Sequence, residues 1–188
     1  MGFRLYYNCY AFEITLQRNM KLKLVLKETV SEQVDEICNL INLAYRGNSG
    51  WTKETDLVSG NRAEFQEVTE YISNQKSHLL VASEAGNVKA CICVEENENR
   101  GYIGFFAVHP DYQGRGKNIL LQAERLASEK LGVRKYVMVV VSQREELISF
   151  YERRGYARTG NIEKYPTHPS VGIPLNSALT IEYLEKDA

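Results

Sequence analysis

The sequence predicts a mixed α/β fold in which helices pack on one central, mixed, mostly antiparallel and twisted sheet. Three strand-like runs follow one another at residues 78–83, 88–94 and 101–108, and turn residues join them. After these runs, helical and strand patterns alternate to the end of the chain. Consecutive hairpin strands followed by alternating helices are typical of a mixed sheet covered by helices.

Hydrophobic spacing and turn residues place the other elements. The alternating run 21–27 predicts a strand, and apolar residues three and four apart predict a helix at 31–46 and a second helix after residue 61. The β-branched run 136–141 predicts a strand buried on both faces. Two more helices are expected, one from 119 that ends near Lys130 and Gly132 and a short one at 142–154 that is ended by Gly155. Strands are expected at 156–159 and 177–184, and loops at 47–60 and 160–176.

Turn and cap patterns supply the boundaries of these elements. The sequence Ala85-Gly86-Asn87 is a hairpin signal between the first two of the consecutive strands. In a capping box, a side chain at the helix start and a Glu or Gln three residues later satisfy each other's backbone N–H groups. Start patterns of this kind occur at Thr29 with Glu32, at Asn61 with Glu64 and at Ser142 with Glu145.

Composition narrows the class of protein. A chain of 188 residues suffices for one domain with a substantial core. Hydrophobic residues make up 44% and charged residues 25%, which is usual for a soluble globular protein. The net charge is −1, so no global field attracts nucleic acid or an anionic membrane, and no apolar run could span a bilayer. We therefore expect neither nucleic acid nor a membrane as a partner.

The N-terminus and the cysteines bear on domain organisation and location. Residues 1–19 are rich in aromatic residues and weakly periodic, and Met20 directly precedes a strand pattern. We expect a tail at 1–19 and one folded domain at 20–188; a signal peptide is disfavoured because the apolar segment is short and broken. The four cysteines form no zinc-binding pattern, so we expect no metal and reduced thiols in a cytoplasmic protein.

Residues 109–118, HPDYQGRGKN, carry the most information about function. They form a glycine-bearing basic turn between an apolar run and a helical pattern. A helix start carries unpaired N–H groups and favours an anion. Gly114 and Gly116 let a phosphate approach the backbone, and Arg115 and Lys117 add positive charge. The turn therefore predicts a pyrophosphate site; the alternative is a turn that needs unusual dihedral angles beside solvated charges.

This turn, in this layout, resembles the GNAT acetyltransferase superfamily, whose pattern there is Q/R-x-x-G-x-G/A. Gln113 and Gly116 match the pattern, whereas Asn118 stands where Gly or Ala is usual. Residues 147–156, LISFYERRGY, resemble the second motif of the superfamily, a helix with a tyrosine that is followed by glycine and an aromatic residue. The resemblance covers roughly residues 20–185.

The resemblance implies an N-acetyltransferase that uses acetyl-CoA as its acetyl donor and acts on a primary amine. In this superfamily the strand before the turn splays from its neighbour, and its backbone groups pair with the pantetheine arm. An N–H group at the end of that strand would polarise the thioester carbonyl. The residues implied to bind acetyl-CoA are Phe106, Ala107, Val108, Gln113, Gly114, Arg115, Gly116, Lys117 and Asn118. Arg144, which stands where the family often has asparagine, either helps to fix the cofactor or shapes the start of its helix.

The resemblance also makes Tyr151 the candidate general acid. A phenol has a reference pKa near 10, so it is protonated at neutral pH and can donate to the departing thiolate. The alternative is that the ring packs in the core and the hydroxyl meets water. No general base is assignable, and a water chain fits as well as any carboxylate. The carboxylates considered are Glu54, Asp56, Glu64 and Glu95.

The acceptor is expected to be a small-molecule or peptide amine. Residues 50–57 with 60–62 resemble the substrate-side loop of one GNAT branch, so Trp51 and Arg62 are candidate acceptor residues. Trp51 either lines the acceptor pocket or anchors its loop. Arg62 either binds an acceptor carboxylate or is a solvated charge. Loops 47–62 and 160–176 are expected to form the pocket.

Two other functions are open at this point. A binding module that senses acyl-CoA without turnover fits the missing base and the departure at Asn118. A generic nucleotide-binding domain is disfavoured, because no G-x-x-x-x-G-K-[ST] run or dinucleotide fingerprint occurs. GNAT relatives are often dimers, so a homodimer is one option for the assembly.

Overall fold

A seven-stranded sheet runs through the structure, a computed structural model that describes residues 24–51, 54–167 and 171–188. Its strand order is β1-β3-β4-β5-β6-β9-β7, and neighbours are antiparallel except the parallel pair β5 and β6. The predicted mixed, mostly antiparallel sheet is confirmed. The strands are β1 (Lys27–Glu28), β3 (Ser77–Glu84), β4 (Asn87–Asn97), β5 (Arg100–Val108), β6 (Lys135–Val141), β7 (Ala157–Lys164) and β9 (Thr180–Asp187).

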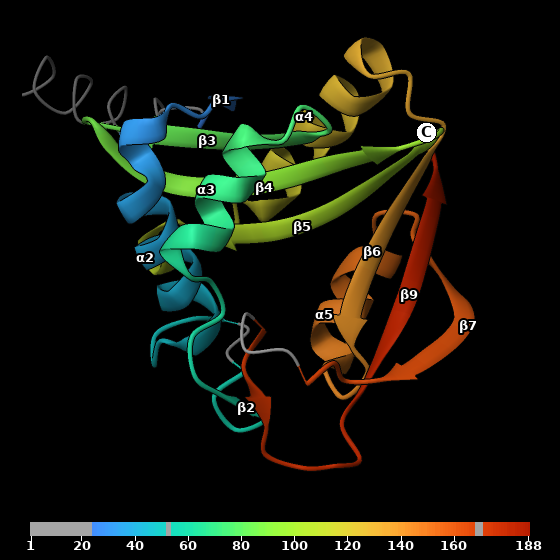
Figure 1. Ribbon diagram of the computed structural model, residues 1–188. Helices are drawn as coiled ribbons and strands as arrows, with labels where there is room; N and C mark the ends of the chain where they lie inside the picture. The colour runs from blue at the N-terminus through green and yellow to red at the C-terminus, as the bar shows by residue number, and fades with distance from the viewer. Residues whose placement is uncertain (1–23, 52–53, 168–170) are drawn as a thin grey trace, which may run out of the picture.

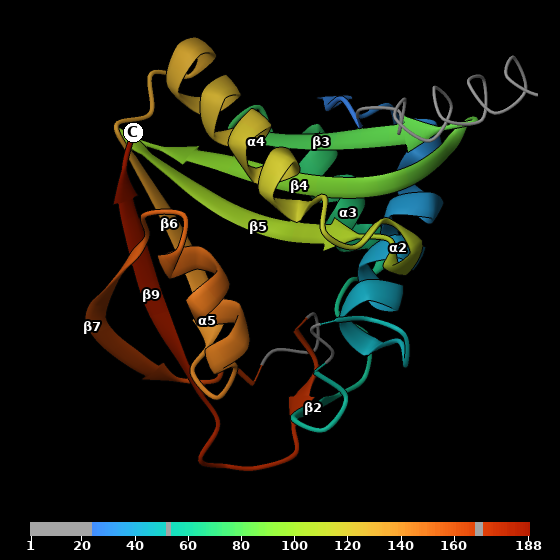
Figure 2. The same ribbon diagram turned by 180° about the vertical axis from the view of Figure 1, so that it is seen from behind.

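Helices cover both faces of this sheet (Figures 1 and 2). One buried cluster lies between the sheet and α2 and α3, and a second lies between the sheet and α4 and α5. Each helix directs one apolar stripe inward, as its periodicity predicts. The helices are α2 (Val34–Arg46), α3 (Phe65–Ser73), α4 (Gly116–Lys130) and α5 (Glu145–Glu152), with short 3₁₀ turns η1 (Ser31–Gln33) and η2 (Pro110–Tyr112).

The sheet opens in the middle, between β5 and β6. The two strands pair from Arg100 and Lys135 to Ile103 and Met138, and then diverge (Figure 1). Where they diverge, the register between β4 and β5 shifts, and Phe105 takes a positive φ of 44°. An extra residue of this kind bends a strand and frees its edge. The structure therefore has the splayed strand pair that the GNAT resemblance implies.

A small second sheet closes the open end. In it, β2 (Val58–Ser59) pairs with β8 (Ile173–Pro174). Gly172 has a φ of 85°, and a Cβ there would lie 2.5 Å from the Ser59 carbonyl oxygen, so the close approach of the two loops requires glycine. The prediction of an unstructured loop at 160–176 was wrong, because β7 extends to Lys164 and β8 lies inside that range.

None of the three predicted cap patterns forms a capping box. The Thr29 hydroxyl donates to the Leu79 carbonyl in the sheet, at 2.6 Å, so it caps no helix. Glu64 rather than Asn61 is the N-cap of α3, and Arg144 rather than Ser142 is the N-cap of α5. The Ser142 hydroxyl is buried without a hydrogen-bond partner among the described residues. The predicted hairpin at Ala85-Gly86 is confirmed, and both of these residues have positive φ.

Three boundaries and one burial prediction also need correction. Of the predicted strand 21–27, only Lys27 is in a strand among the described residues, and β1 continues to Glu28. Helix α4 begins at Gly116 rather than at 119, and α5 ends at Glu152 rather than at 154. Strand β6 is not buried on both faces, because Val139 is 46% exposed at the splay.

Further sequence-based predictions concern the N-terminal tail, membrane-spanning helices, metal sites and cysteines. Residues 1–19, expected to form a tail, lie outside those residues. Within the described part of the chain, no helix is long and apolar enough to cross a membrane. The same residues contain no group of three or more His, Cys, Asp or Glu side chains that could hold a metal ion. Cys38, Cys91 and Cys93 are free thiols, and burial raises the pKa of Cys91 to about 12, so that thiol stays protonated.

Candidate functional site

A cavity of about 390 Å³ lies where the end of β5, the following turn, the start of α4 and helix α5 meet. The end of α2 and the loop after it form the opposite wall. The cavity brings together several residues that the sequence predicted: Trp51, Phe106, Val108, Gln113, Gly114, Gly116 and Tyr151.

The turn presents unpaired backbone donors to this cavity. Among the described residues, the N–H groups of Gly114, Gly116 and Lys117 donate to no protein acceptor. Gly114 has a φ of 86°, a conformation that favours glycine. A Cβ on Gly116 would lie 3.5 Å from the rings of Phe106 and Phe150, in the cavity wall. These donors at the N-terminus of a helix form a concavity that fits a diphosphate.

The side chains of the turn have other contacts. The Gln113 amide donates to the Ser49 carbonyl at 3.1 Å, which ties the turn to the loop after α2. The Arg115 guanidinium lies 5.3 Å from the centre of the Tyr112 ring. Asn118 lies outside the cavity, and its N–H already donates to the Arg115 carbonyl at 3.0 Å. The Gln113 amide and the Asn118 N–H therefore have protein partners, whereas the backbone N–H groups of Gly114, Gly116 and Lys117 are available to an anion.

The free edge of β5 forms a second wall of the cavity. Ala107 is opposite Cys91, and the His109 N–H donates to the Lys89 carbonyl. Since groups of alternate residues point to opposite edges of a strand, the N–H groups of Phe106 and Val108 face away from β4, toward the splay. Ala107 instead directs its buried side chain into the core under α2.

Tyr151 lies at the junction of this cavity with a second one. The second cavity, of about 260 Å³, occupies the splay between β5 and β6, and Tyr151 lines both. Burial raises the pKa of Tyr151, while the positive charges of Arg144 and Arg154 act in the opposite direction. The phenol is therefore protonated at neutral pH and faces both spaces.

Tyr45 also lines both cavities, and sequence reasoning missed it. It lies on the apolar stripe of α2, so its spacing indicated a core residue. Its hydroxyl donates to the Phe106 carbonyl at the free edge of β5, at 3.3 Å. Burial raises its pKa. The only signal in the sequence was a tyrosine in the last turn of a helix, directly before a glycine-bearing loop.

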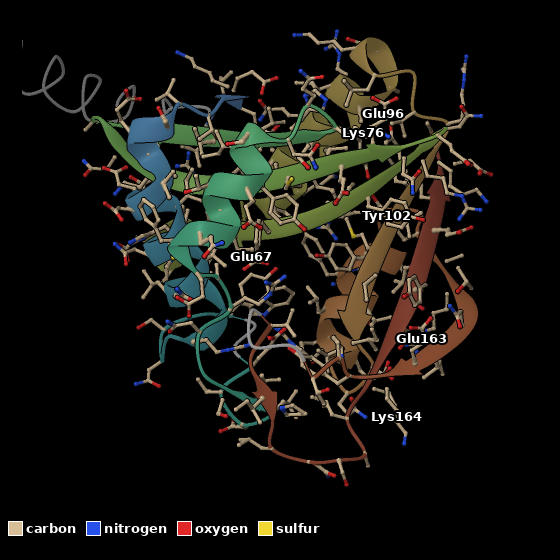
Figure 3. The ribbon with its side chains drawn as sticks, in the orientation of Figure 1. Glu67, Lys76, Glu96, Tyr102, Glu163 and Lys164 are labelled. Atoms are coloured by element: carbon tan, nitrogen blue, oxygen red, sulfur yellow. The ribbon has the colours of Figure 1, made fainter. Side chains whose placement is uncertain are left out.

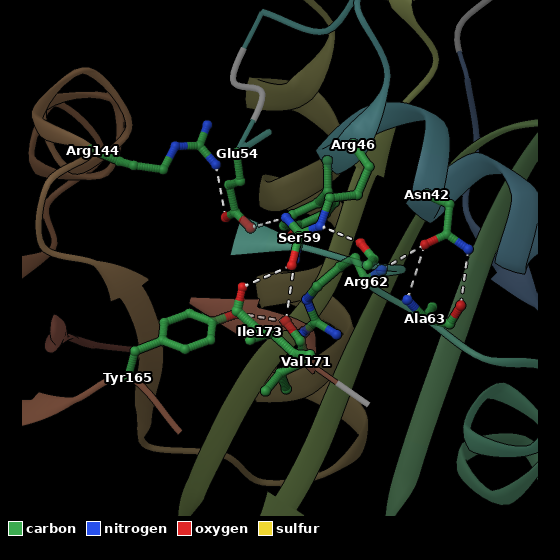
Figure 4. Close-up of polar contacts among 12 residues, drawn as sticks. Asn42, Arg46, Glu54, Ser59, Arg62, Ala63, Arg144, Tyr165, Val171 and Ile173 are labelled. Carbon is green, nitrogen blue, oxygen red and sulfur yellow. Dashed lines mark hydrogen bonds and ion pairs between the residues drawn. The ribbon is translucent and has the colours of Figure 1, made fainter. Parts of the chain in front are cut away.

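A buried ion network forms the wall of the second cavity opposite the sheet. Glu54 is 6% exposed and contacts Arg46 at 2.5 Å and Arg144 at 2.8 Å (Figure 4). Arg46 also donates to the Val171 carbonyl at 3.2 Å and so holds the loop before β8. The structure thus places Arg144 away from the predicted cofactor cavity and in contact with the loop before β2.

Arg62 lies at the second cavity, which Tyr151 also lines. Its guanidinium carbon lies 5.0 Å from the centre of the Phe105 ring and 5.5 Å from that of Tyr45. Asn42 fixes its backbone by accepting the Arg62 N–H at 2.7 Å (Figure 4). Arg62 lines both the 260 Å³ cavity and an adjoining one of about 180 Å³. Trp51 does not line either of these; it lies at the first cavity, 5.8 Å from the Phe150 ring centre.

The four carboxylates considered as bases are placed differently. Glu54 lines the second cavity and is neutralised by two arginines. Glu95 lines the adjoining 180 Å³ cavity, on β4. Asp56 is exposed, and Glu64 is the exposed N-cap of α3, so neither lines a described cavity. This arrangement gives no carboxylate that is both unpaired and next to Tyr151.

Comparison with known proteins decides the family. The family model "Acetyltransferase (GNAT) family" matches residues 35–156, more than half of the chain. The chain belongs to the GNAT acetyltransferase family. As a GNAT protein it is an acyltransferase, and its matched region includes the basic turn, the splayed strands and Tyr151.

Solved structures of other GNAT proteins share this fold. An N-acetyltransferase from Staphylococcus aureus Mu50 is 14% identical, with a TM-score of 0.68 over 87% of this chain and 97% of that chain. A spermidine N-acetyltransferase from Vibrio cholerae, in complex with CoA and spermine, is 15% identical, with a TM-score of 0.65 over 88% and 95%. An IAA acetyltransferase from Bacillus cereus is 18% identical, with a TM-score of 0.62 over 88% and 99%. At these identities the likeness concerns the fold alone.

Proposed function

We propose that this GNAT protein transfers the acetyl group of acetyl-CoA directly to a primary amine. The observation that carries the proposal is the position of Tyr151, which faces a cavity with unpaired N–H donors on one side and a separate cavity in the splay on the other. An acetyl donor and an amine placed in these two spaces meet beside one protonated phenol.

The turn binds the donor through its backbone. The N–H groups of Gly114, Gly116 and Lys117 bind the diphosphate at the start of α4. The pantetheine arm extends along the free edge of β5, and the N–H of Phe106 or Val108 donates to the thioester oxygen. A fixed donor of this kind stabilises the charge that develops on that oxygen.

The reaction then needs two proton movements. The amine nitrogen bonds to the thioester carbon, the carbon–sulfur bond breaks, and the Tyr151 hydroxyl gives its proton to the departing thiolate. The proton that the amine loses passes to water, because the nearby Glu54 is held by Arg46 and Arg144. Water also returns a proton to Tyr151 after the thiol leaves.

Two tyrosine variants test the role of Tyr151. Tyr151→Phe is expected to lower kcat by about 100-fold, within the range for loss of a general acid, and to leave the Kd for acetyl-CoA unchanged. Tyr45→Phe is the matched control, because Tyr45 lines the same two cavities but donates to the Phe106 carbonyl. Thiol release on a panel of amines measures kcat, and calorimetry measures Kd. Equal kcat for wild type and Tyr151→Phe removes this residue from the mechanism, and acetyl-CoA binding without transfer to any amine favours a sensor.

We also propose where the protein is located and what size of acceptor it takes. The free thiols of Cys38, Cys91 and Cys93 support a cytoplasmic location, since oxidising compartments favour disulfides. The volumes of the two acceptor-side cavities, about 260 and 180 Å³, support a small amine as the acceptor, because they lie below the usual size of drug-like ligand sites.

A further inference from the structure

The charges around the acceptor-side cavity indicate what kind of amine it takes. Among the described residues that line the 260 Å³ cavity, the charged side chains are those of Glu54 and Arg62. Behind this wall, Glu54 forms short ion pairs with both Arg46 and Arg144, and Arg144 also contacts Glu146 at 3.4 Å. Counted together, these groups carry three positive and two negative charges, so the surroundings of the cavity have a small positive excess. A polycationic acceptor would need the opposite balance.

Arg62 supplies a cation that has no ion-pair partner within 4 Å among the described residues. Its Nη1 atom is buried without a hydrogen-bond partner in the same part of the chain. Glu67, in the first turn of α3 (Figure 3), acts on Arg62 electrostatically without forming an ion pair with it. Burial raises the pKa of Glu67, and its Oε2 atom is likewise buried without a hydrogen-bond partner among these residues.

The guanidinium is held in place for a ligand. It lies against the faces of the Phe105 and Tyr45 rings, and the Asn42 side chain accepts its backbone N–H. A planar guanidinium that is fixed by stacking and has free N–H groups is suited to a carboxylate. A buried donor without a partner is costly, and a bound carboxylate would remove that cost.

The same cavity connects Arg62 with Tyr151. Both residues line it, and Tyr45 links its two ends, because its ring lies 5.5 Å from the Arg62 guanidinium carbon and its hydroxyl donates to the Phe106 carbonyl. One small molecule can therefore contact Arg62 at one end and present an amine beside Tyr151 at the other. The intervening wall is apolar, with Met138, Val140, Leu147, Val171 and Ile181.

We propose that the acceptor is a small amine that carries a carboxylate, of the amino-acid type, with Arg62 as the anchor for the carboxylate. This inference rests on the proposed acetyl transfer and names the substrate class of that site. An uncharged or apolar side chain on the acceptor fits the apolar wall, and a polyamine does not fit the charge of the site.

A panel of matched acceptors tests the proposal. The proteinogenic L-amino acids are compared with their amides, which keep the shape but lack the negative charge, and with spermidine. Wild-type enzyme is expected to acetylate at least one amino acid with a kcat/KM about 10- to 100-fold above that of its amide, as the loss of a charge-assisted hydrogen-bond pair implies. Equal rates for acid and amide, or a preference for spermidine, overturn the proposal.

Variants of Arg62 test whether this residue causes the preference for the amino acid over its amide. Arg62→Gln is expected to remove the preference for the acid over the amide and to leave the Kd for acetyl-CoA unchanged. Arg62→Lys keeps the charge without the planar fork and is expected to restore part of the preference. Arg134→Gln is the matched control, because Arg134 is exposed and lines none of the described cavities. An unchanged preference in a folded Arg62→Gln protein overturns the proposal.

Binding measurements keep this test separate from that of acetyl transfer. Calorimetric titration of the preferred amino acid into wild-type protein saturated with CoA is expected to show binding that Arg62→Gln loses. If amino acids bind in this way but no amine is acetylated, the proposed transfer fails and the carboxylate site stands. If amines are acetylated but no amino acid binds or reacts, the carboxylate site fails and the transfer stands.

Discussion

The two cavities that meet at Tyr151, the proposed cofactor side at the turn and the proposed acceptor side in the splay, are built from different kinds of contact. On the cofactor side, one short stretch of chain supplies the donors, and these are backbone N–H groups at the start of α4. On the acceptor side, the wall depends on side chains that are far apart in sequence, such as Glu54 with Arg144. A backbone site tolerates side-chain changes, whereas a buried ion network depends on each partner.

This difference has a functional consequence. In the proposed reaction, the cofactor side binds the same diphosphate in every turnover, and glycines with free N–H groups suffice for that. The acceptor side of the proposed reaction has to distinguish amines, and its loops are joined by Arg46, Glu54 and Arg144 in the interior. We expect substitutions on the two sides to change different constants, namely the Kd for acetyl-CoA and the KM for the acceptor.

Glu54→Gln should have the largest effect. It removes the buried carboxylate that contacts both Arg46 and Arg144, and Arg144, whose side chain is 2% exposed, keeps only the exposed Glu146 at 3.4 Å. Removing one partner of a buried ion pair lowers the free energy of unfolding by about 3–5 kcal/mol. Chemical denaturation measures this loss, and the acceptor KM is expected to rise while the Kd for acetyl-CoA changes little.

The matched control for this variant is Glu185→Gln. Glu185 also contacts two cations, Arg100 at 2.8 Å and Lys135 at 2.9 Å, but these pairs lie at the surface. Exposed pairs contribute about 1 kcal/mol or less, so the control should lose little stability. Equal losses for Glu54→Gln and Glu185→Gln would contradict the distinction between a buried network and surface pairs.

Gly116→Glu should have the next largest effect, on the cofactor side. The new side chain would start beside the Phe106 and Phe150 rings, and its carboxylate would repel the diphosphate. We therefore expect the Kd for acetyl-CoA to rise about 100-fold, which corresponds to about 2.7 kcal/mol of binding free energy. Gly116→Gln is the control, since it adds the same bulk without charge. Calorimetry that gives both variants the same Kd, or the Kd of wild type, would rule out an anion site at this turn.

The contrast between the two cavities also explains what sequence reasoning could find. The turn at 113–118 and the hairpin at Ala85-Gly86 depend on neighbours in the chain, so glycines and periodicity predicted them. The pairing of Glu54 with Arg144 spans 90 positions, and nothing local to either residue indicates it. The sequence therefore predicted the GNAT fold and the glycine-bearing turn before a helix, but it left open whether Arg144 contacts the cofactor or shapes its helix start, and it left Glu54 as one of several candidate bases.

The same limit explains the wrong capping boxes and the missed Tyr45. Thr29 has the residue type of a cap, but a strand that is distant in sequence accepts its hydrogen bond. Ser142 has the same residue type, but α5 begins after Arg144, and the Ser142 hydroxyl is buried without a partner in the described part of the chain. Tyr45 has the spacing of a core residue, and only the bend of β5 at Phe105 brings the Phe106 carbonyl to its hydroxyl. Residue type and spacing specify a local conformation, whereas the partner of a polar group depends on the fold.

Asn118→Ala should have the smallest effect, although Asn118 departs from the family pattern. Its N–H already donates to the Arg115 carbonyl, and its side chain lies outside the cavity, so the Kd for acetyl-CoA is expected to change less than about twofold. Alanine is the better helix former and should raise the free energy of unfolding by about 0.5 kcal/mol. Lys117→Ala, which keeps the free N–H and removes a charge, is the control in the same titration. A tenfold change in Kd for Asn118→Ala would show that this side chain reaches the diphosphate and that the cofactor side also depends on side-chain chemistry.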